Sequence, residues 1–396
     1  MKKKFKTFDF LLLFPPILLA GFGIVMIYSA SMVTAAMTEG SPYHFLVRQG
    51  MWFILSLIAF AFTCFFNYKL YQKLTKIIIV LLFLSLLAVE FFGVTLNNAT
   101  SWIQIGPFSV QPSEFVKIGI IIYLASVYTK KQEYISDFFR GVLPPLIIVS
   151  ILLGLIMKQP DIGTAAIIFA IACSIIFSSG VKFRHLSLLI TIGLVLLVFL
   201  VSTMSTDVRI SRFTGAYQPF EDPEDSGYQI IQLYIAIATG GLEGQGLGQG
   251  VQKLGYLTQA ESDFIIGTVA EELGVFGVAF VIGMMALIVL RGLYIAKKCP
   301  DLFGSLLAIG ISCMVAIQAI VNLGATSGLL PITGVPLPFV SYGGTSLLVL
   351  MLSMGILNNI ARHVRYQEFK SDREEIPEND RRQKLTVVKK SKSYAR

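Results

Sequence analysis

The sequence predicts an all-α polytopic membrane protein with about ten transmembrane helices and both termini in the cytoplasm. Of its 396 residues, 55% are hydrophobic and 14% are charged, and the mean hydropathy is +0.72. A soluble domain cannot hide so much apolar surface behind a charged exterior. Apolar runs of about 18 or more residues, each able to cross a hydrocarbon core of about 30 Å, recur along the whole chain.

Ten runs qualify as spans. The first follows the basic segment MKKKFKTF and is kept as a span, because it is long and no clear signal-peptidase site follows it. The fifth is short, but the topology requires it. The ten spans are expected at 10–31, 50–66, 76–93, 113–128, 143–157, 163–180, 186–204, 264–290, 302–324 and 343–360.

The basic residues orient the bundle. With the N-terminus in the cytoplasm, 26 of the 32 Lys and Arg residues fall in cytoplasmic segments and five in outer loops, while Lys117 lies within a span. This asymmetry follows the positive-inside rule. Residues 1–361 should therefore form one transmembrane domain, and residues 362–396 a basic, disordered cytoplasmic tail. The net charge of +8 is expected to meet anionic lipid heads or a protein partner, and not nucleic acid.

Three outer segments have unusual chemistry. The longest loop, 205–262 between the seventh and eighth spans, contains SGYQIIQLYIAIATGG, which predicts a short helix resting on the bundle, and then GGLEGQGLGQG. These glycines could cradle a phosphate, but no strand precedes them and no P-loop pattern follows, so a hinge or close backbone packing is the alternative. Residues 97–114 and the proline- and glycine-rich residues 331–346 suggest re-entrant segments that border an outer cavity.

Charged residues in or beside the spans need a reason, since a charge deep in a span costs at least a few kcal/mol. Glu114 and Lys117 are three residues apart on one helix, so they can pair, either to fix helix packing or to face a functional cavity. Asp161 and Asp263 each stand just before a span, where the carboxylate is either a helix cap or a group that meets substrate. In a partly desolvated cavity, such a carboxylate would suit a general base.

Other chemical sites are less well indicated. Glu271 and Glu272 point to different sides of their helix, so at most one of them can face a shared cavity. The four cysteines have no paired spacing, and the three histidines are scattered over both faces of the membrane. Neither a disulfide framework nor a metal site is expected.

Five motifs carry a resemblance to a known family. They are W-I-x-I-G-x-F-x-x-Q-P-S-E-x-x-K (102–117), P-D-I-G-T (160–164), G-L-G-x-G-x-Q-K-x-G-Y-L (246–257), D-F-I-I-G-x-x-A-E-E-L-G (263–274) and P-x-T-G-V-P-L-P-F-V-S-Y-G-G-T-S (331–346). In order and spacing they resemble the SEDS family (shape, elongation, division and sporulation) of FtsW/RodA type, across nearly the whole membrane domain. The third motif is closer to the FtsW division branch than to the RodA branch.

The chain departs from the family pattern in three places. Gln259 stands where the family usually has Glu, although Glu261 supplies an acid nearby. Ser101 stands where an Arg often precedes the Trp, and Gln159 replaces a common Glu before Pro160. The essential Asp of the family is kept, as Asp263.

The resemblance implies a peptidoglycan glycosyltransferase that polymerises lipid II at the outer face of the bacterial cytoplasmic membrane. Asp263 would be the general base in an inverting displacement of the lipid pyrophosphate, which Lys117, Arg212 and Lys253 would contact. Mg²⁺ or Mn²⁺ could assist, although no dedicated ligand cluster is evident. The residues implied to line the substrate cavity are Trp102, Gln111, Ser113, Glu114, Lys117, Asp161, Arg212, Lys253, Ser341, Gly343 and Gly344.

The resemblance also implies partners and a location. The protein would work at the division septum beside a class B penicillin-binding protein, the transpeptidase that cross-links the glycan, and with other membrane proteins of the divisome. Two other functions fit the sequence: a lipid II flippase, because intramembrane charges and broken loops also suit transporters, and a non-catalytic division scaffold. Activity of the purified protein with lipid II would separate these three hypotheses.

Overall fold

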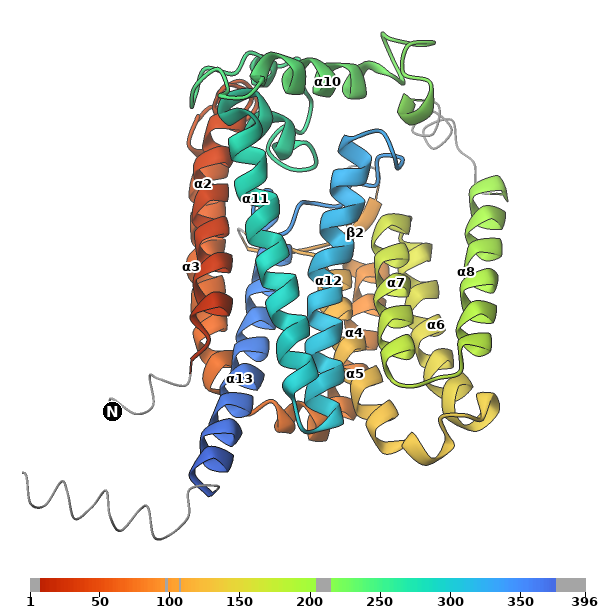
Figure 1. Ribbon diagram of the computed structural model, residues 1–396. Helices are drawn as coiled ribbons and strands as arrows, with labels where there is room; N and C mark the ends of the chain where they lie inside the picture. Colours follow the sequence, from red (N-terminus) through yellow and green to blue (C-terminus); the bar gives the residue numbers. More distant parts are fainter. Residues whose placement is uncertain (1–7, 97–98, 107, 204–214, 375–396) are drawn as a thin grey trace, which may run out of the picture.

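The computed structural model describes residues 8–96, 99–106, 108–203 and 215–374, and its main feature is a bundle of long helices that run roughly along one axis (Figure 1). Within these residues, ten helices have 16 or more residues and confirm the ten apolar runs in order. They are α2 (Phe10–Thr38), α3 (His44–Phe65), α4 (Lys69–Phe92), α5 (Pro112–Lys130), α6 (Leu143–Lys158), α7 (Ile162–Ser178), α8 (Phe183–Thr203), α11 (Ile265–Lys298), α12 (Leu302–Thr326) and α13 (Gly344–Glu374).

Length and apolarity make this bundle a membrane domain. Among the described residues, seven helical segments are long and apolar enough to cross a membrane by themselves, and α7 and the first half of α8 are shorter apolar helices. α5, which carries Glu114 and Lys117, packs against α4, α7 and α12 in the interior. The chain is therefore a multi-pass membrane protein whose charged helix lies inside the bundle.

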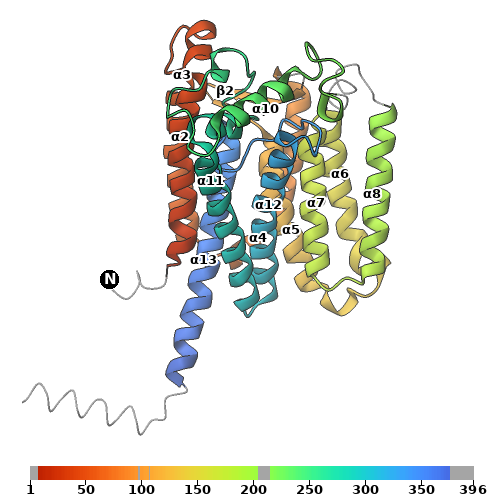
Figure 2. The ribbon, with the colours of Figure 1, turned by 45° about the horizontal axis from the view of Figure 1, so that its top comes forward.

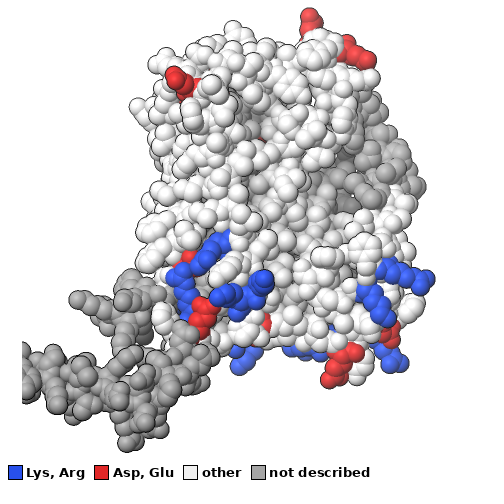
Figure 3. Space-filling model, in the orientation of Figure 1, with Lys and Arg blue, Asp and Glu red and all other residues white. Residues whose placement is uncertain are grey.

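The two ends of the bundle differ in charge. The described chain begins and α13 ends on the same side (Figure 1), as an even number of crossings requires. On the face drawn in Figure 3, Lys and Arg gather at that end. The positive-inside rule makes this the cytoplasmic end.

The cytoplasmic helix ends extend beyond the expected spans. α13 continues to Glu374, so the segment after residue 361 begins as helix and not as a disordered tail. The rest of the expected tail, residues 375–396, lies outside the described residues. Short helical turns, η1 (Gln132–Tyr134) and η2 (Phe138–Val142), join α5 to α6 on the same side.

Glycines allow α13 to pack closely on α3. A Cβ on Gly355 would lie 1.9 Å from Thr63 Oγ1, and one on Gly344 would lie 2.1 Å from the ring of Trp52. Neither contact leaves room for a side chain, so these glycines set the distance between the two backbones. This anchors the start of α13, where the 331–346 segment ends.

The outer side carries small elements in place of a soluble domain. α10 (Tyr228–Gly240) lies across the outer end of the bundle against α11 (Figure 2), which confirms the short helix expected in the long loop. The re-entrant segment expected at 97–114 is wrong: β1 (Val94–Leu96), β2 (Ala99–Ile105) and β3 (Phe108–Val110) form an antiparallel sheet in the order β1-β2-β3. Backbone groups paired within a sheet need no burial in a membrane cavity.

α11 is broken near its outer end. Gly274 has φ 62° and ψ −158°, which divides the helix into an outer arm, residues 265–273, and a long inner part. This backbone conformation is essentially restricted to glycine. The break leaves carbonyl groups of the arm without helical donors, and the loop after α10 supplies them: Gln245 N–H donates to Glu271 O at 2.9 Å and Gly246 N–H to Glu272 O at 3.0 Å.

Candidate functional site

The segment between α12 and α13, residues 331–343, has no regular secondary structure and forms the centre of the outer site. Val335, Leu337, Phe339 and Val340 are buried in the bundle. Irregular backbone at this depth is tolerated where protein or a wet cavity satisfies its polar groups. The proline- and glycine-rich composition therefore gives a buried irregular segment, as the sequence suggested.

This segment holds the turn that carries Asp263. Tyr342 N–H donates to Glu261 O at 2.8 Å, and Ser341 Oγ donates to Ser262 O at 2.5 Å. Asn322 of α12 donates to both Asp263 O and Val335 O, each at 2.9 Å. Four backbone contacts thus fix the turn before α11 against the irregular segment.

The Asp263 side chain lies half-buried at the outer mouth of the bundle. The N-cap residue of α11 is Phe264, so Asp263 does not stand at the cap position of that helix. Gly334 has φ 71°, and a Cβ built on it would lie 3.7 Å from Asp263 Oδ2. The carboxylate therefore faces the irregular segment at a glycine.

A second carboxylate site lies at the start of α7. Asp161 caps this helix, since Thr164 N–H donates to its Oδ1 at 3.2 Å. Its other oxygen, Oδ2, accepts from Gln111 Nε2 at 2.9 Å and from Ser113 Oγ at 3.2 Å. The structure thus brings three of the predicted site residues together, and the capping role expected for Asp161 is confirmed beside them.

The irregular segment connects the two carboxylate sites. A Cβ on Gly163, two residues after Asp161, would lie 2.6 Å from Thr333 O, next to the Gly334 that faces Asp263. Thr345 Oγ1 also accepts from Gln111 N–H at 3.3 Å. One side of the segment therefore meets the Asp161 cluster, and the other side meets the Asp263 turn.

Burial raises the pKa of two carboxyl groups of the outer site, Asp161 and Glu261, which lie just outside the helices. Desolvation raises the pKa of Asp161, against the opposing hydrogen bonds from Thr164 and Ser113, and the nearby Glu114 raises it further. Desolvation also raises the pKa of Glu261, in the turn before Asp263. The carboxyl groups of Asp161 and Glu261 thus hold their protons to a higher pH than they would in water.

Glu114 and Lys117 form an ion pair inside the bundle, one turn into α5. Lys117 Nζ lies 2.7 Å from Glu114 Oε1, and the two side chains are 2% and 5% exposed. Glu114 Oε2 is buried and has no hydrogen-bond partner among the described residues. The pair therefore keeps an unused acceptor beside the Asp161 cluster.

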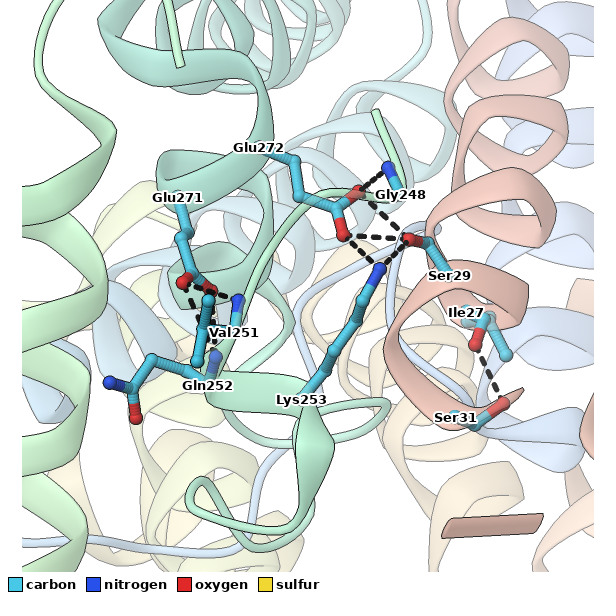
Figure 4. A network of polar contacts seen from close by, with 9 residues as sticks. All are labelled: Ile27, Ser29, Ser31, Gly248, Val251, Gln252, Lys253, Glu271 and Glu272. Atoms are coloured by element: carbon cyan, nitrogen blue, oxygen red, sulfur yellow. Dashed lines mark hydrogen bonds and ion pairs between the residues drawn. The ribbon is translucent and has the colours of Figure 1, made fainter. Parts of the chain in front are cut away.

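Lys253 takes part in a separate network (Figure 4). Its ammonium group lies 2.6 Å from Glu272 Oε1 and donates to Ser29 Oγ of α2 at 2.9 Å. Lys253 is 2% exposed. Its predicted contact with pyrophosphate stays untested, but the ammonium group is already bonded to protein oxygens in this structure.

Glu271 and Glu272, predicted to point to different sides of their helix, bind different parts of one loop. Glu271 Oε1 accepts from Val251 N–H at 2.8 Å, and Glu272 Oε2 accepts from Gly248 N–H at 2.9 Å (Figure 4). The glycine-rich loop wraps onto the broken helix, so one loop reaches both side chains. Of the readings of GGLEGQGLGQG, close backbone packing is the one observed: a Cβ on Gly244 would lie 2.2 Å from Glu272 O.

The remaining predicted residues occupy varied positions. Trp102 is partly buried in β2, opposite Val94. Gly343 N–H donates to Gln49 Oε1 of α3 at 3.4 Å, and Gly344 begins α13. Arg212 lies outside the described residues. Among the described residues, no group of three or more His, Cys, Asp or Glu side chains could hold a metal ion, so no step is derived through a divalent cation.

Sequence reasoning missed residues that organise the site without reacting. Asn322 joins the Asp263 turn to the irregular segment, and Ser29 joins α2 to the Lys253 network. Both are polar residues within long apolar runs, which is a usable signal for buried hydrogen bonding. Their partners, distant in sequence, could not be read from that signal.

The fold and the site together define a polytopic membrane protein with a carboxylate-bearing site at its outer face. The family model described as a cell cycle protein (FtsW, RodA and SpoVE) matches residues 10–366. The chain belongs to this family, which is the SEDS family that its motifs resemble.

Two relatives of Bacillus subtilis (strain 168) are similar over nearly their whole length. The probable peptidoglycan glycosyltransferase FtsW is 47% identical over 387 residues, which cover 95% of this chain and 96% of that protein. The stage V sporulation protein E is 40% identical over 360 residues, which cover 90% and 98%.

Two solved structures share the fold. A chain from a structure described as "Structural coordination of polymerization and crosslinking by a peptidoglycan synthase complex" aligns with a TM-score of 0.72 and 26% identity, over 91% of this chain and 99% of that one. The rod shape determining protein RodA of Thermus thermophilus aligns with a TM-score of 0.65 and 25% identity, over 90% and 97%.

Proposed function

We propose that this protein is a peptidoglycan glycosyltransferase of cell division, which polymerises lipid II into glycan strands at the outer face of the cytoplasmic membrane. Family membership and the name of the 47%-identical relative support the enzyme class. The observation that carries the mechanism is the half-buried carboxylate of Asp263, held at the outer mouth by the irregular segment 331–343.

Asp263 acts as the general base in this proposal. A sugar hydroxyl of the acceptor attacks the anomeric carbon of the donor, and Asp263 takes the hydroxyl proton as the new C–O bond forms. The bond from that carbon to the lipid pyrophosphate breaks at the same time, with the electron pair leaving on the pyrophosphate. A single displacement inverts the anomeric carbon, so an α-linked donor gives a β-linked glycan.

The Asp161 side of the site holds the donor. Glu114 directly follows Ser113, which bonds Asp161, and Lys117 lies one helical turn from Ser113. Lys117 is the predicted pyrophosphate cation nearest to this cluster in sequence. Trp102, Ser341, Gly343 and Gly344 border the same outer region in the proposal. Arg212, which lies outside the described residues, is the second cation proposed to contact the pyrophosphate.

The partners follow from the chemistry of the product. A linear glycan must be cross-linked, and one structural neighbour comes from a synthase complex that couples polymerisation to crosslinking. The proposed partner is therefore a class B penicillin-binding protein, within a larger group of division proteins enriched at the septum. A flippase or a scaffold would need no base at Asp263, which makes this residue the decisive test.

The test compares Asp263→Asn with the wild-type protein, each purified with its partner and supplied with labelled lipid II. Asn is nearly isosteric with Asp but cannot take up the proton of the acceptor hydroxyl, so this change tests the base with little change of shape. Removal of a positioned base should lower the rate of glycan formation by about 10²- to 10⁴-fold. Gel analysis of the glycan chains measures this.

The matched control is Asp225→Asn, which removes an exposed carboxylate from the same outer loop and should leave polymerisation unchanged. Co-purification of the partner shows that each variant folds. Near-normal chains from Asp263→Asn would exclude Asp263 as the base. Wild-type protein that makes no chains would favour the flippase or the scaffold.

A further inference from the structure

The network around Lys253 joins three parts of the chain that lie far apart in sequence. Lys253 belongs to η3 (Gln252–Leu254) in the outer loop, Glu272 to the outer arm of α11, and Ser29 to α2. Figure 4 shows the three side chains converging on one point. They are 2%, 0% and 5% exposed, so the network is internal.

Every oxygen of the Glu272 carboxylate is bonded. Oε1 accepts from Lys253 Nζ at 2.6 Å and from Ser29 Oγ at 2.7 Å. Oε2 accepts from Gly248 N–H at 2.9 Å and lies 2.8 Å from Ser29 Oγ. Hydrogen bonds to a buried, charged carboxylate are strong, so Glu272 holds Lys253, Ser29 and Gly248 in one arrangement.

The network acts at the break in α11. Beyond Gly274, the outer arm lacks the helical continuation that would fix its direction, and Val275 N–H instead donates to Gly241 O at 3.1 Å. Glu271 adds a second clamp, since its Oε1 accepts from Val251 N–H and Gln252 N–H at 2.8 and 3.2 Å. The loop and α2 therefore hold the Gly274 end of the arm, while Asn322, Ser341 and Tyr342 hold the turn at its other end.

Asp263 lies at the far end of that arm. The nine helical residues 265–273 span about 13 Å at 1.5 Å per residue, so a tilt of about 4° at Gly274 moves the other end by about 1 Å. A misplacement of about 1 Å can cost about 10²-fold in rate. A change in the direction of the arm would thus misalign Asp263 with its substrate.

We propose that Lys253, Glu272 and Ser29 are positioning residues, which fix the outer arm of α11 and through it Asp263. Lys253 in this role binds protein and not the lipid pyrophosphate. The inference rests on the proposed function of Asp263 as the base. In this role, Lys253 affects the rate of the reaction and does not affect the affinity for substrate.

The test measures rate, affinity and loop structure in Lys253→Met. The maximal polymerisation rate should fall by about 10²-fold, while the apparent KM for lipid II and its binding in nanodiscs stay within about twofold. The double variant Lys253→Met with Glu272→Gln removes the unpaired buried charge and keeps an acceptor for Gly248 N–H and Ser29 Oγ. It should recover about tenfold of the lost rate.

Hydrogen–deuterium exchange gives a readout that does not depend on activity. Amides of residues 244–253 and 259–268 should exchange faster in Lys253→Met and return toward wild-type rates in the double variant. The matched control is Lys158→Met. Lys158 forms an ion pair of the same 2.6 Å length with Glu90, but the side chains are 64% and 41% exposed, so neither rate nor exchange should change.

Each outcome decides the proposal. A raised KM with lost lipid II binding and no recovery in the double variant would show that Lys253 contacts the pyrophosphate. That result would overturn the positioning role. Unchanged rate and exchange in Lys253→Met would overturn it as well. If the wild-type protein makes no glycan, the proposed function fails, and the exchange data alone show whether Lys253 anchors the arm.

Discussion

The described part of the chain holds two buried lysine–glutamate pairs, and they differ in what surrounds them. In both pairs the lysine is 2% exposed, and the N–O distances are 2.7 Å for Lys117–Glu114 and 2.6 Å for Lys253–Glu272. The first pair lies three residues apart on one helix, and the second joins a loop to a broken helix. Distance and burial alone would give them the same role.

The second oxygen of each carboxylate separates them. Glu272 Oε2 accepts from Gly248 N–H, whereas Glu114 Oε2 has no hydrogen-bond partner among the described residues. A fully bonded carboxylate is a structural element, while an unused acceptor in the interior needs a water molecule or a ligand. The comparison supports a structural role for the Lys253 pair, and it leaves the Lys117 pair as the one proposed to contact substrate.

The largest expected effect is on the stability of the bonded pair. Glu272→Ala leaves the Lys253 ammonium group buried without its carboxylate and removes an acceptor from Gly248 and Ser29. The free energy of unfolding should fall by about 3–5 kcal/mol. Thermal unfolding of the detergent-solubilised protein measures this loss. The same measurement on Glu114→Ala should show a smaller decrease in the free energy of unfolding. Equal losses would end the distinction between the two pairs.

The next effect concerns use of substrate. Lys117→Met should raise the apparent KM for lipid II by about 10- to 100-fold, because a charge-assisted hydrogen bond is worth about 1.5–3 kcal/mol. Its melting temperature should fall by less than that of Glu272→Ala, since the change removes the one hydrogen bond from Lys117 to Glu114 Oε1 and leaves Glu114 itself in place. Polymerisation at varied lipid II concentration gives the KM.

A charge exchange provides the control for Lys117. Glu114→Lys combined with Lys117→Glu keeps the attraction within the helix but moves the cation by one turn. If Lys117 contacts substrate, this double variant stays impaired. Full recovery of polymerisation would show that the pair only fixes helix packing, as the Lys253 pair is expected to do.

The smallest effect is a pH dependence at Asp161. Because burial raises the pKa of Asp161, the folded protein holds this proton to a higher pH than the unfolded chain does. The resulting stability is complete below the ordinary pKa of an aspartate and is lost as the pH rises through the raised pKa. Asp161→Asn still caps α7 and cannot ionise. Its melting temperature should therefore rise relative to that of the wild-type protein as the pH rises.

Melting temperatures of both proteins from about pH 4 to about pH 8 test this expectation. Parallel curves would show that the Asp161 carboxyl group ionises as it does in water. The Glu114 carboxylate raises the same pKa, so the pH-dependent difference should shrink in a Glu114→Gln background. That result would show that the Glu114 and Asp161 carboxyl groups interact electrostatically.

The sequence was sufficient for the helices, because a membrane span is a local property. Ten apolar runs of the right length predict ten helices wherever they pack. Residues 97–114 were misread since a short antiparallel sheet depends on pairing such as Ile103 with Val110, which periodicity in so brief a segment does not reveal. The continuation of α13 past residue 361 was missed because charge was taken as a sign of disorder.

The site was predicted less completely, for a related reason. The grouping of Gln111, Ser113 and Asp161 followed from the family motifs, and the structure brings these three residues together. The partners of Lys253 could not be foreseen, because Ser29 lies 224 residues away and Glu272 faces the loop only where α11 is broken. Contacts created by an irregular backbone have no periodic signature.

The break at Gly274 also has a consequence for the gene. Its backbone conformation is open only to glycine, and a Cβ there would lie 2.3 Å from Leu242 O. Every missense change of this codon therefore distorts the arm, whatever chemical group it introduces. In a saturation screen for cell division, Gly274 should rank among the least replaceable positions although it offers no functional group. Intolerance to substitution at such a site reports shape and not chemistry.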